Sequence, residues 1–223
     1  MSGLHSPPRP HTRSRMSYSA DEVRQILACL ANPEDVAGVA LAAFAGFRST
    51  ELARLKRTDV REDKIFIRAD KSGQDRCIPV LDLLRVWLMP LLNSSRFLAR
   101  GLPSPAAIAR HSKAQGLTVE FRRLRRSFVA YRFAATGDLA LTAAEAGIAQ
   151  PVFRRTIPIS HREEAAKFWA LTPEACGRAD WEESVQTWLK AQSHGRTAAG
   201  RGTPGRSVAQ PEGGKRGPTW PAK

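Results

Sequence analysis

Cysteine and histidine are scarce in this sequence of 223 residues, which contains three cysteines and five histidines. The cysteines (Cys29, Cys77 and Cys176) are far apart, and no pair has the two-residue spacing of a zinc site or a redox motif. The histidines are scattered in the same way. We therefore exclude a disulfide framework and expect no metal and no small-molecule cofactor. Free cysteines also fit a reducing compartment.

Long hydrophobic runs are missing as well. The longest apolar run, 36–47 (VAGVALAAFAGF), is too short to cross a bilayer, which requires about 20 apolar residues. The N-terminus contains arginine and proline but no apolar segment of the signal-peptide type. The sequence therefore predicts a soluble, cytoplasmic protein with no membrane partner.

Acidic residues are few relative to basic ones, with 21 Asp and Glu against 35 Lys and Arg, a net charge of +14. Such an excess attracts polyanions, among which nucleic acid is the commonest. More than half of the excess lies near the two ends of the chain. Inside the chain, residues 100–155 form one basic block, with ten basic and three acidic residues.

Both ends of the chain have few large aliphatic residues. Residues 1–18 are rich in Pro, Ser and Arg, and residues 193–223 are rich in Gly and Pro. Neither segment can bury enough apolar surface to order itself, so we expect two disordered basic tails. The hydrophobic content of 42% is sufficient for a core in the part between them. We therefore expect one domain at 19–192.

The spacing of apolar residues predicts a mainly α-helical (α+β) domain with one small antiparallel β-hairpin. A capping box formed by Ser19 and Glu22 starts the first helix, and the SHRE sequence suggests a second box formed by Ser160 and Glu163. TPEA at 172–175 suggests the start of a last helix. On either side of 69–75 the apolar residues recur at every second position, which indicates the two strands of the hairpin. Further helices are expected at 34–45, 49–55, 82–92, 105–113, 118–136, 138–146, 150–156 and 161–170.

Three cationic features follow one another along the chain. Arg48 follows a buried helix, Lys71 lies on the hairpin turn, and Arg122 and Arg125 lie three residues apart on one helix face. Arginine can bind two phosphate oxygens at once, and a lysine can donate a proton to a bridging oxygen. The set suits a phosphodiester. Each member alone is explained as well by a solvated or capping role, and Tyr131 on the same helix is interpreted as a core residue.

Four segments together resemble the catalytic domain of the tyrosine recombinases, the phage-integrase family. The segment LAAFAGFRSTELARLKRTDV resembles the motif that presents the first catalytic arginine, and KIFIRADKSGQDRCIPV resembles the hairpin that carries the catalytic lysine. The segment RRLRRSFVAYRFAATGD resembles the His-x-x-Arg motif, and AAEAGIAQPVFRRTIPISHREEAAKFWAL resembles the closing segment. The resemblance covers roughly 19–171 and implies the helical fold of that catalytic domain.

The resemblance also implies a set of site residues. Arg48, Lys71 and Arg125 fall at catalytic positions of the family, and duplex DNA is the implied partner. An active integrase of the same family is a further possible partner. The residues expected to contact DNA are Arg48, Lys71, Arg123, Arg125, Arg126, Arg154 and Arg155.

Three positions depart from the family pattern. Thr156 stands where the nucleophilic tyrosine is expected, and the two tyrosines of the chain, Tyr18 and Tyr131, lie outside the closing segment. Arg122 replaces a histidine and cannot act as a base near neutral pH. Ile148 replaces a later His or Asn and cannot bind phosphate. An aliphatic hydroxyl is less acidic and shorter than a phenol, so we expect catalysis to be lost.

The family clamps duplex DNA between this domain and an N-terminal helical domain, whereas only residues 1–18 precede the resembling region here. We therefore expect reduced sequence-specific affinity. Three functional hypotheses remain open at this point. The first is a DNA-binding protein without catalysis. The second is a divergent strand transferase that uses Thr156 or a partner's tyrosine, and the third is a decayed mobile-element fragment or interaction module with no role on DNA.

Overall fold

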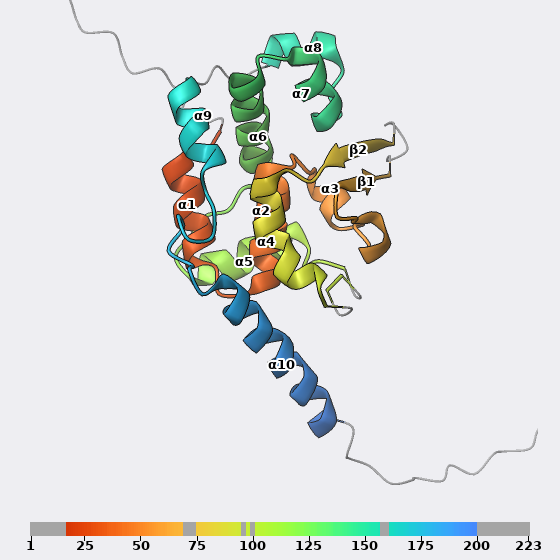
Figure 1. Cartoon of the computed structure of the whole chain (residues 1–223), viewed down its shortest axis with the longest axis vertical. Helices are drawn as coiled ribbons and strands as arrows, with labels where there is room; N and C mark the ends of the chain where they lie inside the picture. Colours follow the sequence, from red (N-terminus) through yellow and green to blue (C-terminus); the bar gives the residue numbers. More distant parts are fainter. Residues whose placement is uncertain (1–16, 69–74, 95–96, 99–100, 157–160, 200–223) are drawn as a thin grey trace, which may run out of the picture.

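The computed structural model describes residues 17–68, 75–94, 97–98, 101–156 and 161–199, without the side chains of 154–156 and 193–199. Lys71 and Ser160 therefore lie outside the described residues. Within this part the chain is mostly helical with one two-stranded antiparallel sheet, which confirms the predicted fold class (Figure 1). The elements are α1 (Ala20–Cys29), α2 (Pro33–Phe44), α3 (Ser49–Leu52), the 3-10 helix η2 (Arg57–Asp59), β1 (Lys64–Ile67), β2 (Arg76–Pro79), α4 (Asp82–Leu92), α5 (Pro105–Ala114), α6 (Phe121–Thr136), α7 (Leu139–Ala146), α8 (Gln150–Thr156), α9 (Arg162–Trp169) and α10 (Trp181–Ala199).

Helix α2 forms the centre of the core. Asn32 caps its N-terminus by accepting a hydrogen bond from the backbone N–H of Glu34, and Pro33 occupies the first turn. Eleven of its twelve residues are buried, and it packs against both α6 and α4. The small residues allow close approach: a Cβ at Gly38 would lie 2.6 Å from Cδ1 of Ile108 on α5. An Ala-rich helix that is apolar on every side is therefore buried among the other helices at the centre of the domain.

The hairpin lies beside the helical body. Its register pairs Ile65 with Ile78 on the buried face and Phe66 with Cys77 on the exposed face, as the two-residue period requires. Helix α7 packs against β2. The sheet follows the segment after α3 in the chain, and its strand β2 contacts α7. Figure 1 shows α7 and α8 above the sheet.

Both tyrosines of the chain are buried and hydrogen-bonded. The Tyr131 hydroxyl donates to the carbonyl of Tyr18 at 2.9 Å, and burial raises the pKa of Tyr131 to about 12. The Tyr18 hydroxyl donates to the carbonyl of Thr118 at 3.0 Å and accepts from the N–H of Glu120 at 3.0 Å. The interpretation of Tyr131 as a core residue is confirmed, and Tyr18 is a core residue too.

One predicted helix start was wrong, and another lies within one residue of its predicted position. Helix α9 begins at Arg162 with His161 as its N-cap residue, and the predicted capping box includes Ser160, which lies outside the described residues. The TPEA segment makes one turn, in which Cys176 donates to the carbonyl of Thr172 at 3.0 Å, before the chain leaves it through Gly177 at φ +74°. Left-handed backbone ends a helix. The last helix, α10, begins only at Trp181.

Near the ends of the described part, Tyr18 is buried in the core, and α10 continues past residue 192 to Ala199. Helix α6 begins at Phe121 instead of residue 118. No helix of the described residues is long and apolar enough to cross a membrane.

Gly46 offers a test of this packing. Its φ is +65°, and an added Cβ would lie 2.4 Å from Cδ1 of Phe128 on α6. We expect Gly46→Ala to lower the free energy of unfolding by about 3 kcal/mol, because left-handed strain and overpacking act together. Chemical denaturation measures this change. The matched control is Gly116→Ala, where φ is +76° with no atom within 4 Å and only the strain of about 1 kcal/mol applies. Equal losses in the two variants would contradict the overpacking.

Candidate functional site: an arginine cluster at the end of helix α7

Arg48 and Arg125, the two arginines that match catalytic arginines of the family, lie at one place. Arg48 is the residue immediately before α3, and its Nη2 donates to the carbonyl of Gly147. Arg125 lies on α6 and donates through Nη1 to the carbonyl of Gly46 and through Nη2 to the carbonyl of Ala146. Positions 77 residues apart in the sequence therefore meet at the C-terminal end of α7.

A third arginine, which the sequence analysis missed, completes the group. Nη1 and Nη2 of Arg76 on β2 donate to the two carboxylate oxygens of Glu51 at 2.6 and 2.7 Å, and Nε donates to the carbonyl of Glu145 at 3.0 Å. Arg76 shares the inward face of β2 with Ile78. An arginine at an inward strand position is the signal that could have identified it, because a buried charge requires a partner.

Glu51 holds two of the three guanidinium groups. Besides Arg76, it accepts a hydrogen bond from Nη1 of Arg48 at 2.7 Å and one from the Arg48 backbone N–H at 2.7 Å. Burial alone would raise the pKa of Glu51, but the hydrogen bonds and positive charges of Arg76 and Arg48 outweigh it and lower the pKa to about 2. Glu51 is therefore ionised over the whole physiological range.

All carbonyl groups at the end of α7 accept a hydrogen bond, and the three arginines donate the last three of these bonds. The N–H groups of Gly147 and Ile148 donate to the carbonyls of Ala144 and Ala143 at 3.0 and 2.9 Å, as in a Schellman motif. The next three carbonyls each accept from a different arginine, Glu145 from Arg76, Ala146 from Arg125 and Gly147 from Arg48. We call Arg48, Arg76 and Arg125 the arginine cluster. It neutralises the negative end of the α7 dipole.

The cluster carries more positive charge than its surroundings balance. Three guanidinium groups face the single carboxylate of Glu51. Burial and the repulsion from Arg48 lower the pKa of Arg125, with Glu51 opposing and Arg76 adding to the effect, so that the pKa falls to about 9. A site that destabilises its own positive charge favours an incoming anion.

The other residues predicted to belong to the site or to contact DNA lie at several places in the fold. Arg122 is exposed and lies one turn from Arg125, and Arg126 is half-buried. Arg123 is turned toward the N-terminal segment, where its guanidinium lies 3.8 Å from the Tyr18 ring centroid and donates to the carbonyl of Ser17 at 3.1 Å. The backbone of α8 includes three predicted site residues whose side chains are not described, Arg154, Arg155 and Thr156.

Ile148, at the later His or Asn position, has an apolar environment. It packs against the small cluster of buried residues formed by Phe128, Val129, Ala143, Ala146 and Phe153. The side chain therefore contributes to holding α7 and α8 on α6.

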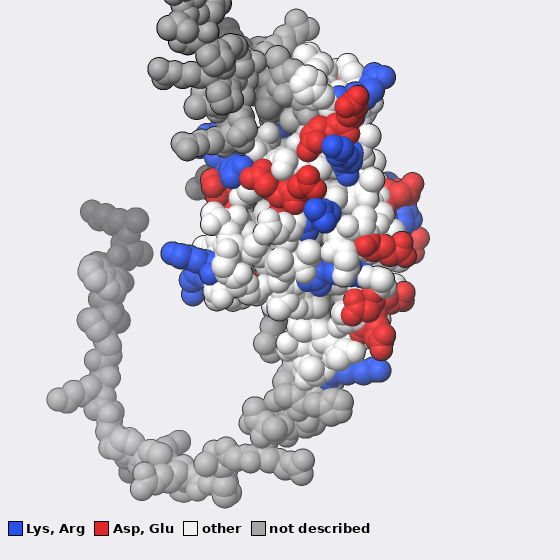
Figure 2. All heavy atoms as spheres, turned by 90° about the vertical axis from the view of Figure 1, so that its left-hand side faces the viewer, with Lys and Arg blue, Asp and Glu red and all other residues white. Residues whose placement is uncertain are grey.

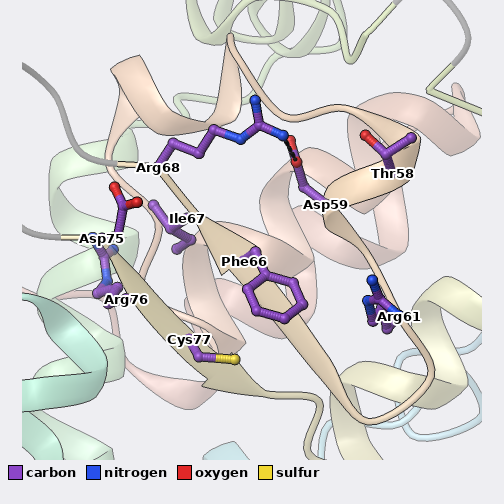
Figure 3. A pocket seen from close by; sticks show the side chains of 9 residues that line it. All are labelled: Thr58, Asp59, Arg61, Phe66, Ile67, Arg68, Asp75, Arg76 and Cys77. Atoms are coloured by element: carbon purple, nitrogen blue, oxygen red, sulfur yellow. Dashed lines mark hydrogen bonds and ion pairs between the residues drawn. The ribbon is translucent and has the colours of Figure 1, made fainter.

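A second feature is a hollow of about 490 Å³ on the outer face of the hairpin (Figure 3). Arg61 lies 5.5 Å from the ring centroid of Phe66, and Arg68 pairs with Asp59 at 3.0 Å across the hollow. Charges of both signs line it, so it is less suited than the arginine cluster to a polyanion. Among the residues that the structure describes, no group of three or more His, Cys, Asp or Glu could hold a metal ion.

Replacing Glu51 tests the electrostatics of the cluster. We expect Glu51→Gln to lower the free energy of unfolding by about 3 kcal/mol at pH 7, because buried guanidinium groups lose their counter-charge. The pKa of Glu51 is lowered in the folded protein, so its contribution is complete above its ordinary pKa of 4.5 and is lost as the pH falls toward 2.

The difference in stability between wild type and Glu51→Gln should therefore shrink between pH 4.5 and pH 2. Urea titrations at several pH values measure it. Glu163→Gln, on the exposed side of α9, is the control and should stay within about 0.5 kcal/mol of wild type. A constant difference across this pH range would show that the Glu51 carboxylate is not stabilised by the arginines.

Comparison with known proteins identifies the fold of the chain through similar solved structures only. No protein-family model and no curated protein matches the sequence. Among solved structures, the chain is similar to XerA recombinase (22% identity, TM-score 0.55), over 74% of this chain and 65% of that one. It is also similar to XerH site-specific recombinase bound to a palindromic difH substrate (20% identity, TM-score 0.50), over 69% of this chain and 52% of that one. It thus spans between half and two thirds of these recombinases, and it has the fold of the tyrosine-recombinase catalytic domain.

Proposed function

We propose that this protein binds duplex DNA through the arginine cluster and does not cleave it. The observation that carries the proposal is the excess of positive charge at the cluster, where Arg48 and Arg125 meet beside a single carboxylate. A phosphodiester is the anion that the fold and the family resemblance suggest. XerH, which has the same fold, was crystallised on its DNA substrate.

The cluster is a better DNA-contacting surface than the face seen in Figure 2. On that face, acidic and basic side chains are interspersed over the described atoms. Elements of the fold also carry paired charges, such as Asp21 and Arg24 on α1 at 3.1 Å and Glu164 and Lys167 on α9 at 3.8 Å. A surface with interspersed charges has little net attraction for a duplex. In the proposed complex, Lys71, Arg122, Arg126, Arg154 and Arg155 would contact phosphates around the cluster.

The loss of catalysis follows from the side chains that could act as a nucleophile. The hydroxyls of Tyr18 and Tyr131 are buried in the core, and burial raises the pKa of both. Thr156 is a weak substitute because an aliphatic hydroxyl ionises far less readily than a phenol. Arg122 supplies no base, and Ile148 supplies no hydrogen bond to the phosphate. A protein of this kind could act beside an active integrase as a regulator.

One observation favours a second candidate, a module without a role on DNA. Each arginine of the cluster already donates to a backbone carbonyl, so all three have a structural role in the unbound protein. This candidate predicts that changing Arg48 alters stability but not affinity for DNA.

The binding experiment separates the two candidates. We expect Arg48→Gln to weaken duplex binding about tenfold and to reduce the slope of log affinity against log salt by about 1, because one phosphate contact is lost. Fluorescence anisotropy with a labelled duplex at several salt concentrations measures both. Arg48→Lys should fall between wild type and Arg48→Gln, because lysine keeps the charge but not the bidentate geometry.

The matched control is Arg24→Gln, which removes one exposed positive charge from α1. The two variants carry the same net charge, so a difference between them cannot come from overall attraction. If Arg48→Gln and Arg24→Gln bind alike, the cluster is not the DNA site and the proposed function fails.

Covalent chemistry is tested with Thr156→Tyr. We expect no protein–DNA adduct on denaturing gels with a nicked duplex, because Arg122 and Ile148 still occupy the two histidine positions. Wild type should give none either. An adduct formed by wild type and lost in Thr156→Ala would establish the strand-transferase alternative. An adduct formed only by Thr156→Tyr would show that the tyrosine alone was missing.

A further inference from the structure

Arg125 is held differently from the other two members of the arginine cluster. Glu51 holds those two through its carboxylate. Arg125 donates instead to two neutral groups of the described chain, the carbonyls of Gly46 and Ala146. Neutral acceptors orient a guanidinium group without cancelling its charge. The direction of the Arg125 side chain therefore depends on where these two carbonyls lie.

The position of the Ala146 carbonyl depends on how α7 lies on α6. Half of the residues of α7 are alanine, and its buried residues Ala143 and Ala146 pack in one cluster with Phe128 and Phe153. Hydrophobic burial has no direction, and the register between two helices comes from the side-chain ridges that interlock. Methyl groups make only shallow ridges. Apolar packing therefore brings α7 against α6 but fixes its register weakly.

The ion pair between Arg132 and Glu145 is a directional contact between the same two helices. Arg132 on α6 donates through Nε and Nη2 to the two carboxylate oxygens of Glu145 on α7, both at 2.8 Å. The side chain of Glu145 is 5% exposed and that of Arg132 is 16% exposed. A bidentate pair fixes direction as well as distance, and burial protects it from screening by salt. This pair therefore supplies the register that the alanines do not.

The ion pair and Arg125 act on neighbouring residues of α7. Arg132 lies seven residues after Arg125, which is two turns further along the same face of α6. Arg125 reaches the carbonyl of Ala146, and Arg132 reaches the side chain of Glu145, the residue before it. The acid that fixes the position of Ala146 is thus paired with another arginine, so it does not neutralise Arg125.

We propose that Arg132 and Glu145 are positioning residues of the phosphate site, whose ion pair sets the register of α7 on α6 and thereby the direction of Arg125. The inference rests on the proposed binding of DNA and adds to it two residues that act through the end of α7 rather than on the phosphate. Glu51 positions Arg48 and Arg76 directly, whereas Glu145 positions Arg125 through a backbone carbonyl.

Net charge and positioning predict opposite effects for Glu145→Gln. The variant removes one negative charge, and a more basic protein attracts a duplex more strongly. Loss of the ion pair, however, displaces Arg125, so we expect duplex binding to weaken about fivefold, as is typical of coupling within one hydrogen-bond network. Fluorescence anisotropy with the full chain and a labelled duplex measures the affinity. Urea titration first establishes that each protein is folded under the conditions of the binding assay.

The matched control is Glu163→Gln, which makes the same change in charge at an exposed position on α9. It should bind as tightly as wild type or slightly more tightly. If Glu145→Gln binds like Glu163→Gln, the pair only stabilises the fold, and the inference is overturned while the proposed function stands. If wild type does not bind the duplex, the proposed function fails and the inference fails with it.

Arg132→Lys tests the pair without a change in net charge, and it decides the question if Glu145→Gln does not fold. Lysine keeps the positive charge but loses the bidentate geometry, so we expect duplex binding about twofold weaker than that of wild type. Arg24→Lys, in an exposed pair on α1, makes the same substitution and should leave the affinity unchanged. Equal affinities of the two lysine variants would overturn the inference.

Discussion

The bidentate ion pair between Glu51 and Arg76 is the interaction on which the site depends. It connects the segment after α2 to the β-hairpin, and through Nε of Arg76 it reaches the end of α7. The same carboxylate orients Arg48. Because Glu51 is buried, breaking the pair would leave uncompensated charge inside the protein, at a cost of about 3–5 kcal/mol. One acid thus holds together three elements that are distant in sequence.

Arginine capping of helix ends is a general feature of this chain and explains part of its basic composition. The last turns of α1, α4 and α7 contain no basic residue of their own. Arg178 donates to carbonyls at the end of α1, including that of Leu27 at 2.7 Å, and Arg57 donates to the carbonyl of Leu92 at the end of α4 at 3.2 Å. In each case a distant arginine supplies the positive charge that the helix dipole favours. The arginine cluster at α7 extends this arrangement to three donors.

This arrangement gives the arginines of the cluster two compatible roles. An active site that binds phosphate requires guanidinium groups held in fixed positions, and backbone carbonyls hold them without neutralising their charge. The excess charge remains available for an anion, as the lowered pKa of Arg125 indicates. Loss of a nucleophile would therefore leave the cluster intact, because the fold itself still needs it. Such arginines are consistent with DNA binding and with a purely structural role, and the effect of replacing Arg48 on DNA affinity separates the two.

The sequence by itself determined the elements and the positions of two cluster members. The apolar spacing of α2, α6 and the hairpin is local, and Arg48 and Arg125 lie in motifs that can be read along the chain. Tertiary structure alone decided the rest. The TPEA segment has good capping residues, but the left-handed turn at Gly177 ends it after one turn, and the last helix begins only at Trp181. Arg76 was not predicted because its role depends on Glu51 and on the carbonyls of α7, which approach it only when the chain is folded. The local sequence decides where helices form, because it sets the spacing of apolar and polar residues. The pairing of buried charges depends instead on which elements pack together.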